Sequence, residues 1–327
     1  MPRRLKLVLV AGLFVLAASP TFYSASAWAQ NSARQRQIEA RPIPGPARAL
    51  PTPRVHAVKP SPSHSNRVYS ATPRGLFVSD DGGQAWVPLP VASTHEEVFS
   101  LAVHPADPGA VLVGRRDGLW HTRDGGGSWA PLGYPTPGPY IPLAIALSAS
   151  QPNVIYMATA RQGVFKSADG GSSWTSASTG LPEAAAGGRP EELRTLVVHP
   201  RNPDVAYIAH ELHGVYRTTD GGASWQPFNQ GLGLPLWQAI YPPRLAFDPD
   251  DPGRLYLVFG QRIHSHLIKN RLSVTSDAGE WLPVEVELPA NTRFVGLSVD
   301  PRRRALHFWA QDAVWELPLP GTSRQRP

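Results

Sequence analysis

The chain has 327 residues, of which 42% are hydrophobic and 17% charged, and its formal net charge is +6. This composition predicts a globular chain with a large core and excludes a disordered one. The chain contains no cysteine, which excludes disulfides, thiol chemistry and thiolate metal sites.

Residues 1–29 form a segment of their own. They have a basic start, an apolar stretch over Leu5–Ala18 without an acid, and small residues at Ala27 and Ala29. This pattern predicts a signal peptide cleaved before Gln30, and hence a periplasmic or secreted protein. The alternative is a membrane anchor, for which the apolar stretch is short. After cleavage the net charge is +3, which does not suggest a nucleic-acid binder, and we expect no stable membrane span.

The two ends of the remaining chain differ from its middle. Residues 30–54 are rich in Arg, Pro and Ala, which predicts an exposed arm. Residues 321–327 are polar and basic and predict a disordered tail.

Residues 55–320 contain six copies of one plan. Each copy opens with an apolar strand followed by a turn that contains Pro, and a second strand comes next. The first strands are expected at Val55–Val58, Val98–Val103, Ile141–Leu147, Leu193–Val198, Leu245–Phe247 and Phe294–Val299. The second strands are expected at Val68–Thr72, Val111–Arg115, Val154–Ala158, Val205–Ala209, Leu255–Phe259 and Leu306–Ala310. A third strand begins with a Gly-aliphatic-aromatic triplet in four copies, and copy five departs from this with Arg271-Leu272-Ser273.

An eight-residue motif joins the third strand to a short fourth strand in five copies. Its order is a hydroxyl residue, Asp, Gly and Trp, and the fifth copy is one residue short. The motif residues are Asp81 and Trp86, Asp124 and Trp129, Asp169 and Trp174, Asp220 and Trp225, and Asp277 and Trp281. The Asp and hydroxyl side chains can accept hydrogen bonds from backbone N–H groups of a tight turn. We expect the Trp to cover the base of its own hairpin. We therefore interpret the motif as structural.

Four short antiparallel strands, repeated radially, predict an all-β fold: a six-bladed β-propeller of four-stranded antiparallel blades. Copy six lacks a fourth strand. Part of residues 40–54 could supply it, although the prolines there are tolerated only on an outer edge strand.

The repeated motif resembles the Asp-box, or bacterial neuraminidase repeat, and the resemblance covers residues 55–320. Sortilin-type propellers and photosystem II stability/assembly factors share its DGG-x-S-W form and bind polypeptides without catalysis. Exo-sialidases are catalytic and six-bladed, and xyloglucanases use related repeats in two domains. In these families the motif lies on the face opposite the binding or catalytic site.

The resemblance implies a non-enzymatic exported scaffold that binds another protein or an anionic or glycan ligand, without a cofactor. The alternatives are an exo-glycosidase of sialidase type and an extracellular carbohydrate-binding module. A sialidase needs three converging Arg residues. The segment most similar to the first Arg motif of sialidases is Arg41-Pro42-Ile43-Pro44, which has an inserted Pro. We therefore expect no catalytic residues.

If the Asp turns define a lower face, the loops between second and third strands and the links between blades form an upper face. We expect binding residues there, because Arg and aromatic residues are enriched where interfaces bind tightly; the alternative is ordinary solvated loops. The candidates are Arg74, Arg115, Arg116, Arg161, His213, Trp237, Tyr241 and Arg262. His264 and His266 are spaced for a metal but lack an evident third ligand, so we expect no metal site.

Overall fold

A computed structural model describes fifteen stretches of the chain. They are residues 38–39, 41–42, 54–64, 66–133, 141–160, 162–182, 193–233, 243–248, 250–263, 266–275, 279–284, 286–288, 292–300, 304–310 and 313–319. The expected signal peptide, most of the arm and the tail lie outside them. Within these stretches every regular element is a β-strand. No helix in the described residues is long and apolar enough to cross a membrane.

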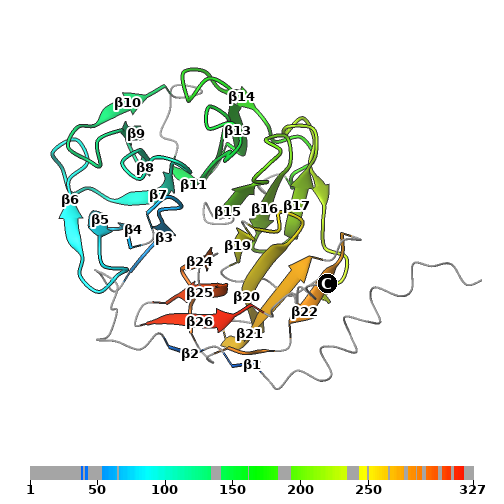
Figure 1. Ribbon diagram of the computed structural model, residues 1–327. Coiled ribbons are helices and arrows are strands. Elements are labelled where there is room, and N and C mark those ends of the chain that lie inside the picture. Colours follow the sequence, from blue (N-terminus) through cyan, green and yellow to red (C-terminus); the bar gives the residue numbers. More distant parts are fainter. Residues whose placement is uncertain are drawn as a thin grey trace, which may run out of the picture. The chain divides into compact units, whose positions relative to one another are not determined.

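The strands form six four-stranded antiparallel blades, which confirms the predicted fold class (Figure 1). The first blade consists of β3 (Ala57–Pro60), β4 (Val68–Thr72), β5 (Gly75–Ser79) and β6 (Val87–Leu89). The second consists of β7 (Val98–Val103), β8 (Val111–Arg115), β9 (Gly118–Thr122) and β10 (Ala130–Leu132). The third consists of β11 (Pro142–Leu147), β12 (Ile155–Thr159), β13 (Val164–Ser167) and β14 (Thr175–Ser176). The next two are β15 (Leu193–Val198), β16 (Ala206–His210), β17 (Gly214–Thr218) and β18 (Gln226–Pro227); and β19 (Arg244–Phe247), β20 (Leu255–Ile263), β21 (His266–Thr275) and β22 (Trp281–Val284).

The sixth blade is completed by the N-terminal arm. It contains β24 (Gly296–Asp300), β25 (Ala305–Trp309), β26 (Val314–Pro318) and β2 (Arg41–Pro42), and β2 pairs antiparallel with β26. β2 is the outermost strand of this sheet, a position where Pro42 removes no inner ladder hydrogen bond. Just before it, β1 (Ile38–Glu39) pairs in parallel with β23 (Val286–Glu287), which follows the fifth blade.

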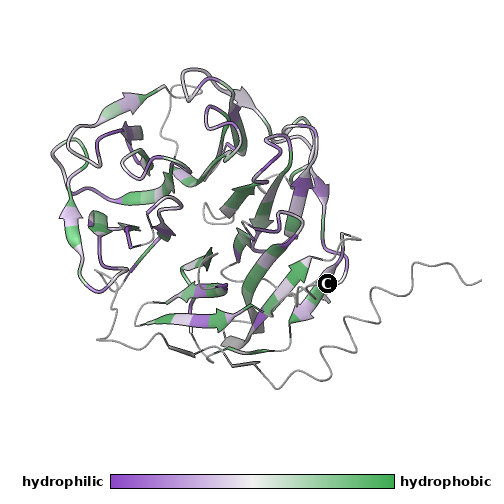
Figure 2. Ribbon diagram, viewed as in Figure 1, coloured by the Kyte–Doolittle hydropathy of each residue, from purple (hydrophilic) through white to green (hydrophobic). Residues whose placement is uncertain are grey.

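The first strand of each blade contacts the first strand of the next, and β24 contacts β3, so the six blades close a ring. Apolar residues concentrate on the inner strands (Figure 2). Six clusters of buried side chains fill the six spaces between neighbouring blades, one cluster for each space. The second strand β4 is buried along its whole length. Both faces of a blade are therefore covered by other blades.

Four motif turns have the same hydrogen bonds. In the first, the Ser79 hydroxyl donates to Asp81 Oδ1 over 2.7 Å and accepts from the Gly83 N–H over 2.7 Å. Asp81 Oδ1 accepts from the N–H of Ala85 over 2.9 Å. Gly82 and Gly83 have φ values of 75° and 92°, a region that favours glycine. The Gly82 N–H donates to Asn66 O over 2.8 Å, so the motif also anchors the neighbouring turn. Asp277 of the fifth copy lies outside the described residues.

The motif Trp residues contact their own turns, as Trp174 does through a hydrogen bond from Nε1 to Gly171 O over 3.2 Å. They also bridge blades, which the sequence did not predict. Trp225 Nε1 donates to Ala177 O of the preceding blade over 2.7 Å, and Trp281 Nε1 donates to Phe228 O over 2.7 Å. Both side chains are 1% exposed. Trp86 of the first blade packs against the cluster containing Trp309 of the sixth. The fourth strand lies at the outer edge, so its Trp reaches the neighbouring sheet.

The first prediction concerns acid stability. Hydrogen bonds from Ser173 and Ser224 hold the pKa values of Asp169 and Asp220 at about 2, below the usual 3.8. The stability these carboxylates contribute is present above pH 3.8 and is lost as the pH falls toward 2. We expect a double variant, Asp169→Asn with Asp220→Asn, to show a shallower loss of unfolding free energy between pH 4 and pH 2 in urea titrations. An unchanged slope would contradict this expectation.

The second prediction concerns the bridging tryptophans. Trp225→Ala removes a buried side chain and should lower the free energy of unfolding by about 3–5 kcal/mol. Trp129 is partly exposed, and its Nε1 has no hydrogen-bond partner among the described residues. The matched variant Trp129→Ala should therefore cost clearly less in chemical denaturation. Equal losses would show that the buried bridge is not the source of the stability.

Candidate functional site

The lower face is built from turns that satisfy their own backbone. His104 Nδ1 accepts from the N–H of Ala106 over 3.2 Å, and His199 Nδ1 accepts from Arg201 over 3.2 Å. Asp248 accepts from Asp250 in the same place over 3.0 Å. These hydrogen bonds show that the His and Asp residues cap their turns.

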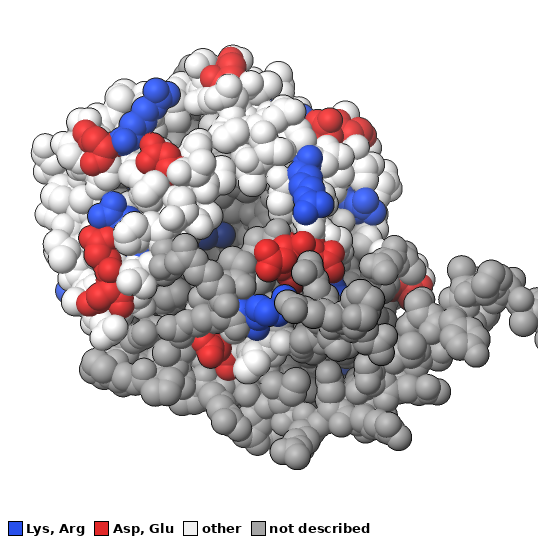
Figure 3. Space-filling view, viewed as in Figure 1, with Lys and Arg blue, Asp and Glu red and all other residues white. Residues whose placement is uncertain are grey.

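The expected upper-face residues are distributed over several blades. Arg74 is exposed in the turn after β4, Arg116 is exposed after β8, and His213 is exposed after β16. Arg262 lies in β20, where the structure describes only the backbone. Arg161, Trp237 and Tyr241 lie outside the described residues. The described members belong to the first, second and fourth blades. The face seen in Figure 3 has acidic and basic side chains interspersed.

Arg115 has a structural role. It is 3% exposed, and its guanidinium donates to Val91 O over 2.9 Å and to Thr94 Oγ1 over 2.8 Å. It also pairs with Glu96 over 2.5 Å and with Asp117 over 3.0 Å. Arg115 thus holds the link between the first two blades, and it neutralises two of the carboxylates nearby.

The same link presents Glu97 to the inner strand of the first blade. Glu97 Oε1 lies 2.9 Å from His56 Nε2. The ring of Phe99 stacks on His56 with centroids 5.5 Å apart, and Arg116 lies 5.8 Å from the Phe99 centroid. We name His56, Glu97, Phe99 and Arg116 the rim cluster. It places a carboxylate, half exposed and paired with an imidazole, beside the axis of the ring.

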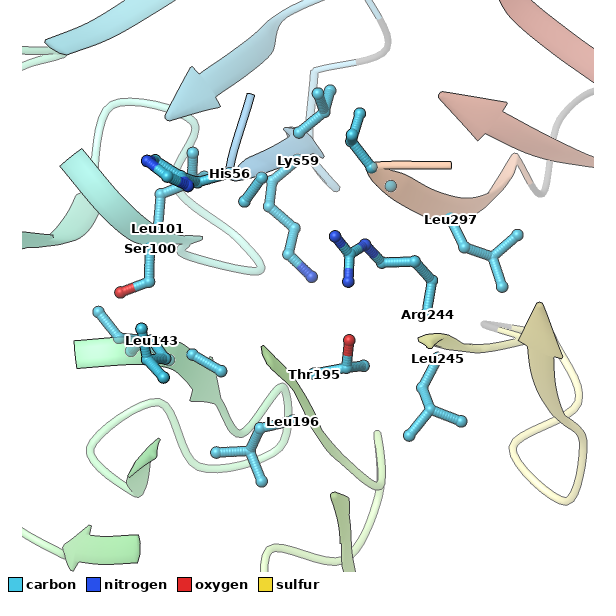
Figure 4. A pocket seen from close by; sticks show the side chains of 16 residues that line it. His56, Lys59, Ser100, Leu101, Leu143, Thr195, Leu196, Arg244, Leu245 and Leu297 are labelled. Atoms are coloured by element: carbon cyan, nitrogen blue, oxygen red, sulfur yellow. The ribbon is translucent and has the colours of Figure 1, made fainter. Parts of the chain in front are cut away.

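The axis contains a cavity of about 40 Å³, lined by residues from the first strands of all six blades. The centre of the ring is hollowed in Figure 3, with Lys or Arg atoms visible in the hollow. Figure 4 shows Lys59 and Arg244 extending toward one another across the cavity, with the Thr195 hydroxyl directed toward the Arg244 guanidinium. The Ser100 hydroxyl donates to Pro142 O over 2.7 Å, and that of Thr195 donates to Pro243 O over 2.6 Å.

The sequence contained a signal for Lys59 that the motif analysis missed. In the aligned first strands, the other blades have small or apolar residues at the position of Lys59. These are Ala102, Ala146, Val197, Ala246 and Ser298. Burial, followed by the nearby charge of Arg244, lowers the pKa of Lys59 from 10.5 to about 8. The channel therefore contains a lysine at a position where the other five copies of the repeat have small or apolar residues.

Neither a sialidase-type Arg triad nor a metal cluster is found among the described residues. Arg41, the nearest match to a sialidase Arg, lies in the outermost strand of its blade, and Arg244 is the one Arg among the described residues that line the channel. No group of three His, Asp or Glu side chains in the described ranges could hold a metal. His264 lies outside those ranges.

Comparison with known proteins adds a family and several relatives. The model of the family "Sortilin, neurotensin receptor 3" matches residues 162–287. A xyloglucanase of a Paenibacillus species is 30% identical over 40% of this chain and 15% of its own length. A probable oligoxyloglucan-reducing end-specific xyloglucanase of Neosartorya fischeri is 25% identical over 53% of this chain and 17% of its own. The chain therefore spans less than a fifth of either relative.

The solved structure of the GH74 xyloglucanase from Xanthomonas campestris has the same fold as this chain. It superposes with a TM-score of 0.59 at 19% identity, covering 84% of this chain and 43% of the enzyme.

These relatives contradict the expectation of a non-enzymatic protein-binding scaffold. Both curated relatives are xyloglucanases, which favours the glycosidase or carbohydrate-binding alternative. The error has a physical reason. The eight-residue motif builds a turn on the lower face and is compatible with any chemistry on the other face, so its form does not distinguish a scaffold from an enzyme.

The motif recurs at blade spacing, the six blades close a ring, and the matching family model covers three successive motif copies. The chain belongs to the Asp-box β-propeller superfamily.

Proposed function

We propose that this protein acts on a glycan, as a propeller of glycoside hydrolase type whose substrates are xyloglucan-like polysaccharides or their oligosaccharides. The similarity of the chain to two curated xyloglucanases is the observation that supports this proposal.

The rim cluster is the proposed site of glycan contact. Glycoside hydrolysis needs a carboxyl group that can transfer a proton to or from the scissile region. Three carboxylates lie on this part of the upper face, and Arg115 pairs with two of them, Glu96 and Asp117. Glu97 instead contacts His56. We therefore assign to Glu97 the role of the general acid or base that exchanges a proton with the sugar.

His56 would orient that carboxylate. Its ring is held by stacking on Phe99, and its Nε2 lies within hydrogen-bond distance of Glu97. A carboxylate fixed by a neighbour with a constrained ring loses less rotational freedom when a substrate binds. Arg115 would act indirectly, because it fixes the link that contains Glu97.

The third prediction tests Glu97. Purified protein is incubated with xyloglucan, xyloglucan oligosaccharides and a panel of other β-glucans, and released reducing ends are measured. We expect Glu97→Gln to lower kcat by about 10²- to 10⁴-fold, the usual contribution of a general acid or base. Glu316→Gln is the matched control, since Glu316 also pairs with a histidine, His307, at 3.1 Å, but in the sixth blade.

A loss of the same size in both variants would indicate a general effect on folding and would contradict the role of Glu97.

The second candidate function is carbohydrate binding without hydrolysis, favoured by the fact that the chain spans only 15% and 17% of the two xyloglucanases. In that case no reducing ends appear, and titration calorimetry shows oligosaccharide binding that Glu97→Gln weakens and Glu316→Gln leaves intact.

Export is part of the proposal. The basic start and apolar stretch of residues 1–29 support a periplasmic or secreted location, where polysaccharides are accessible. Signal cleavage before Gln30 would be read by N-terminal sequencing of the protein recovered from the host.

A further inference from the structure

One position in the second strand of each blade faces the next blade. In the first blade it is Tyr69, which packs in one buried cluster with Val103 and Val111 of the second blade. The strand registers align five residues with Tyr69, and these are Leu112, Tyr156, Tyr207, Tyr256 and His307. Leu112 of the second blade is the one member of this set without a ring.

The tyrosines join their blade to the turn of the next one. The Tyr69 hydroxyl donates to Pro108 O over 2.9 Å, and the Tyr156 hydroxyl donates to Pro203 O over 2.9 Å. Both side chains are fully buried. Each of these spaces between blades is therefore occupied by an aromatic ring, and the backbone oxygen at its end accepts a hydrogen bond from the phenol.

The space beside Leu112 contains a cavity of about 320 Å³ between the second and third blades. Leu147 and Ile155 line it, and they correspond to the residues of the second blade against which Tyr69 packs. Pro152 also lines it and has the place of Pro108 and Pro203 in the turn. Leu112 has no hydroxyl and cannot donate to Pro152 O in the same way. This volume lies at the lower end of the range of small-molecule sites.

His121 lies on another wall of the cavity. It pairs with Leu112 across the strands, as Lys166 and Arg217 pair with the tyrosines of the third and fourth blades. Those two cations lie 5.4 Å and 5.7 Å from the centroids of the tyrosine rings. Burial, followed by the nearby charge of Arg123, lowers the pKa of His121 from 6.5. The imidazole is therefore mostly neutral at pH 7 and suits contact with an aromatic ring.

We propose that this cavity binds a phenol, an aromatic ring with a hydroxyl group. We name Leu112, His121, Leu147, Pro152 and Ile155 the interblade pocket. The ring of the ligand would lie against the aliphatic side chains and His121, and its hydroxyl would donate to Pro152 O. The bound group would thus repeat the contacts that Tyr69 and Tyr156 make within the chain.

This inference is independent of the proposed function. Thr122 and Gly170 of two motif turns also line the cavity, which places it on the lower face, away from the rim cluster. The exposed side chains of Asp107, Arg123 and Asn153 line it as well. They would meet polar substituents of the ligand at the side that is open to solvent.

The fourth prediction compares two ligands by equilibrium dialysis against the full chain at pH 7. We expect 4-methylphenol to bind. We expect 4-methylanisole, which has the same ring and no donor, to bind about 2- to 10-fold more weakly, the effect of one hydrogen bond. Leu112→Tyr places the chain's own phenol in the pocket. This variant should lose the binding and should have a Tm a few degrees above that of the wild type.

The control is Val87→Tyr, which adds a tyrosine on an outer strand where Val87 is 61% exposed. It should keep the binding of 4-methylphenol. The converse variant, Tyr156→Leu, should create a corresponding pocket between the third and fourth blades and raise the number of bound ligands from one to two. Equal binding in the wild type and Leu112→Tyr, or equal binding of the two ligands, would overturn the proposal.

A measurement on the wild type covers the case in which a variant does not fold. A phenol that carries a diazirine is irradiated with the protein, and the labelled residues are identified by peptide mass spectrometry. Labels in the interblade pocket are expected, and labels confined to other parts of the chain would contradict it. N-acetyltyrosine amide then separates two sources of the same group. Tighter binding of the amide than of 4-methylphenol indicates a tyrosine side chain of a polypeptide, and the reverse order indicates a free phenolic compound.

Discussion

Contact between the faces of neighbouring blades is the interaction on which this fold depends. Each blade is a sheet whose second strand is buried from end to end, as β4 and β8 illustrate. Such a sheet has no face for water and is not stable alone. A row of blades would leave two faces exposed, whereas a ring leaves none. The contact of Trp86 with Trp309 between the first and sixth blades therefore stabilises all the others, and β2 from the N-terminal arm completes the blade on one side of it.

The two faces of the ring divide structure from chemistry. On the lower face, the motif carboxylates are used by backbone N–H groups of their own turns, as Asp81 is by Ala85. On the upper face, the links differ in length and composition from blade to blade. There Glu97, in the link before the second blade, meets His56 of the first blade. In this repeat fold, the candidate functional residues therefore lie in the links, where the sequences of the copies differ.

The channel follows the same rule. Five blades place small or apolar residues at the level of Lys59, and at the level of Arg244 the other blades have Ala57, Ser100, Ala144, Thr195 and Gly296. These departures from the repeat bring two long cationic side chains into the channel.

The sequence by itself determined the class of the fold, the number of blades and the turn chemistry. Short apolar runs and a turn motif are local signals, and Ser79, Asp81 and Gly83 lie within five residues of one another. It did not determine what the tryptophans contact, since Trp225 meets Ala177 through a hydrogen bond that spans 48 positions. Nor did it reveal the pairing of His56 with Glu97, or the meeting of Lys59 with Arg244. Those contacts exist only because the ring closes and brings residues of different blades to one axis, a distance in sequence that no local pattern encodes.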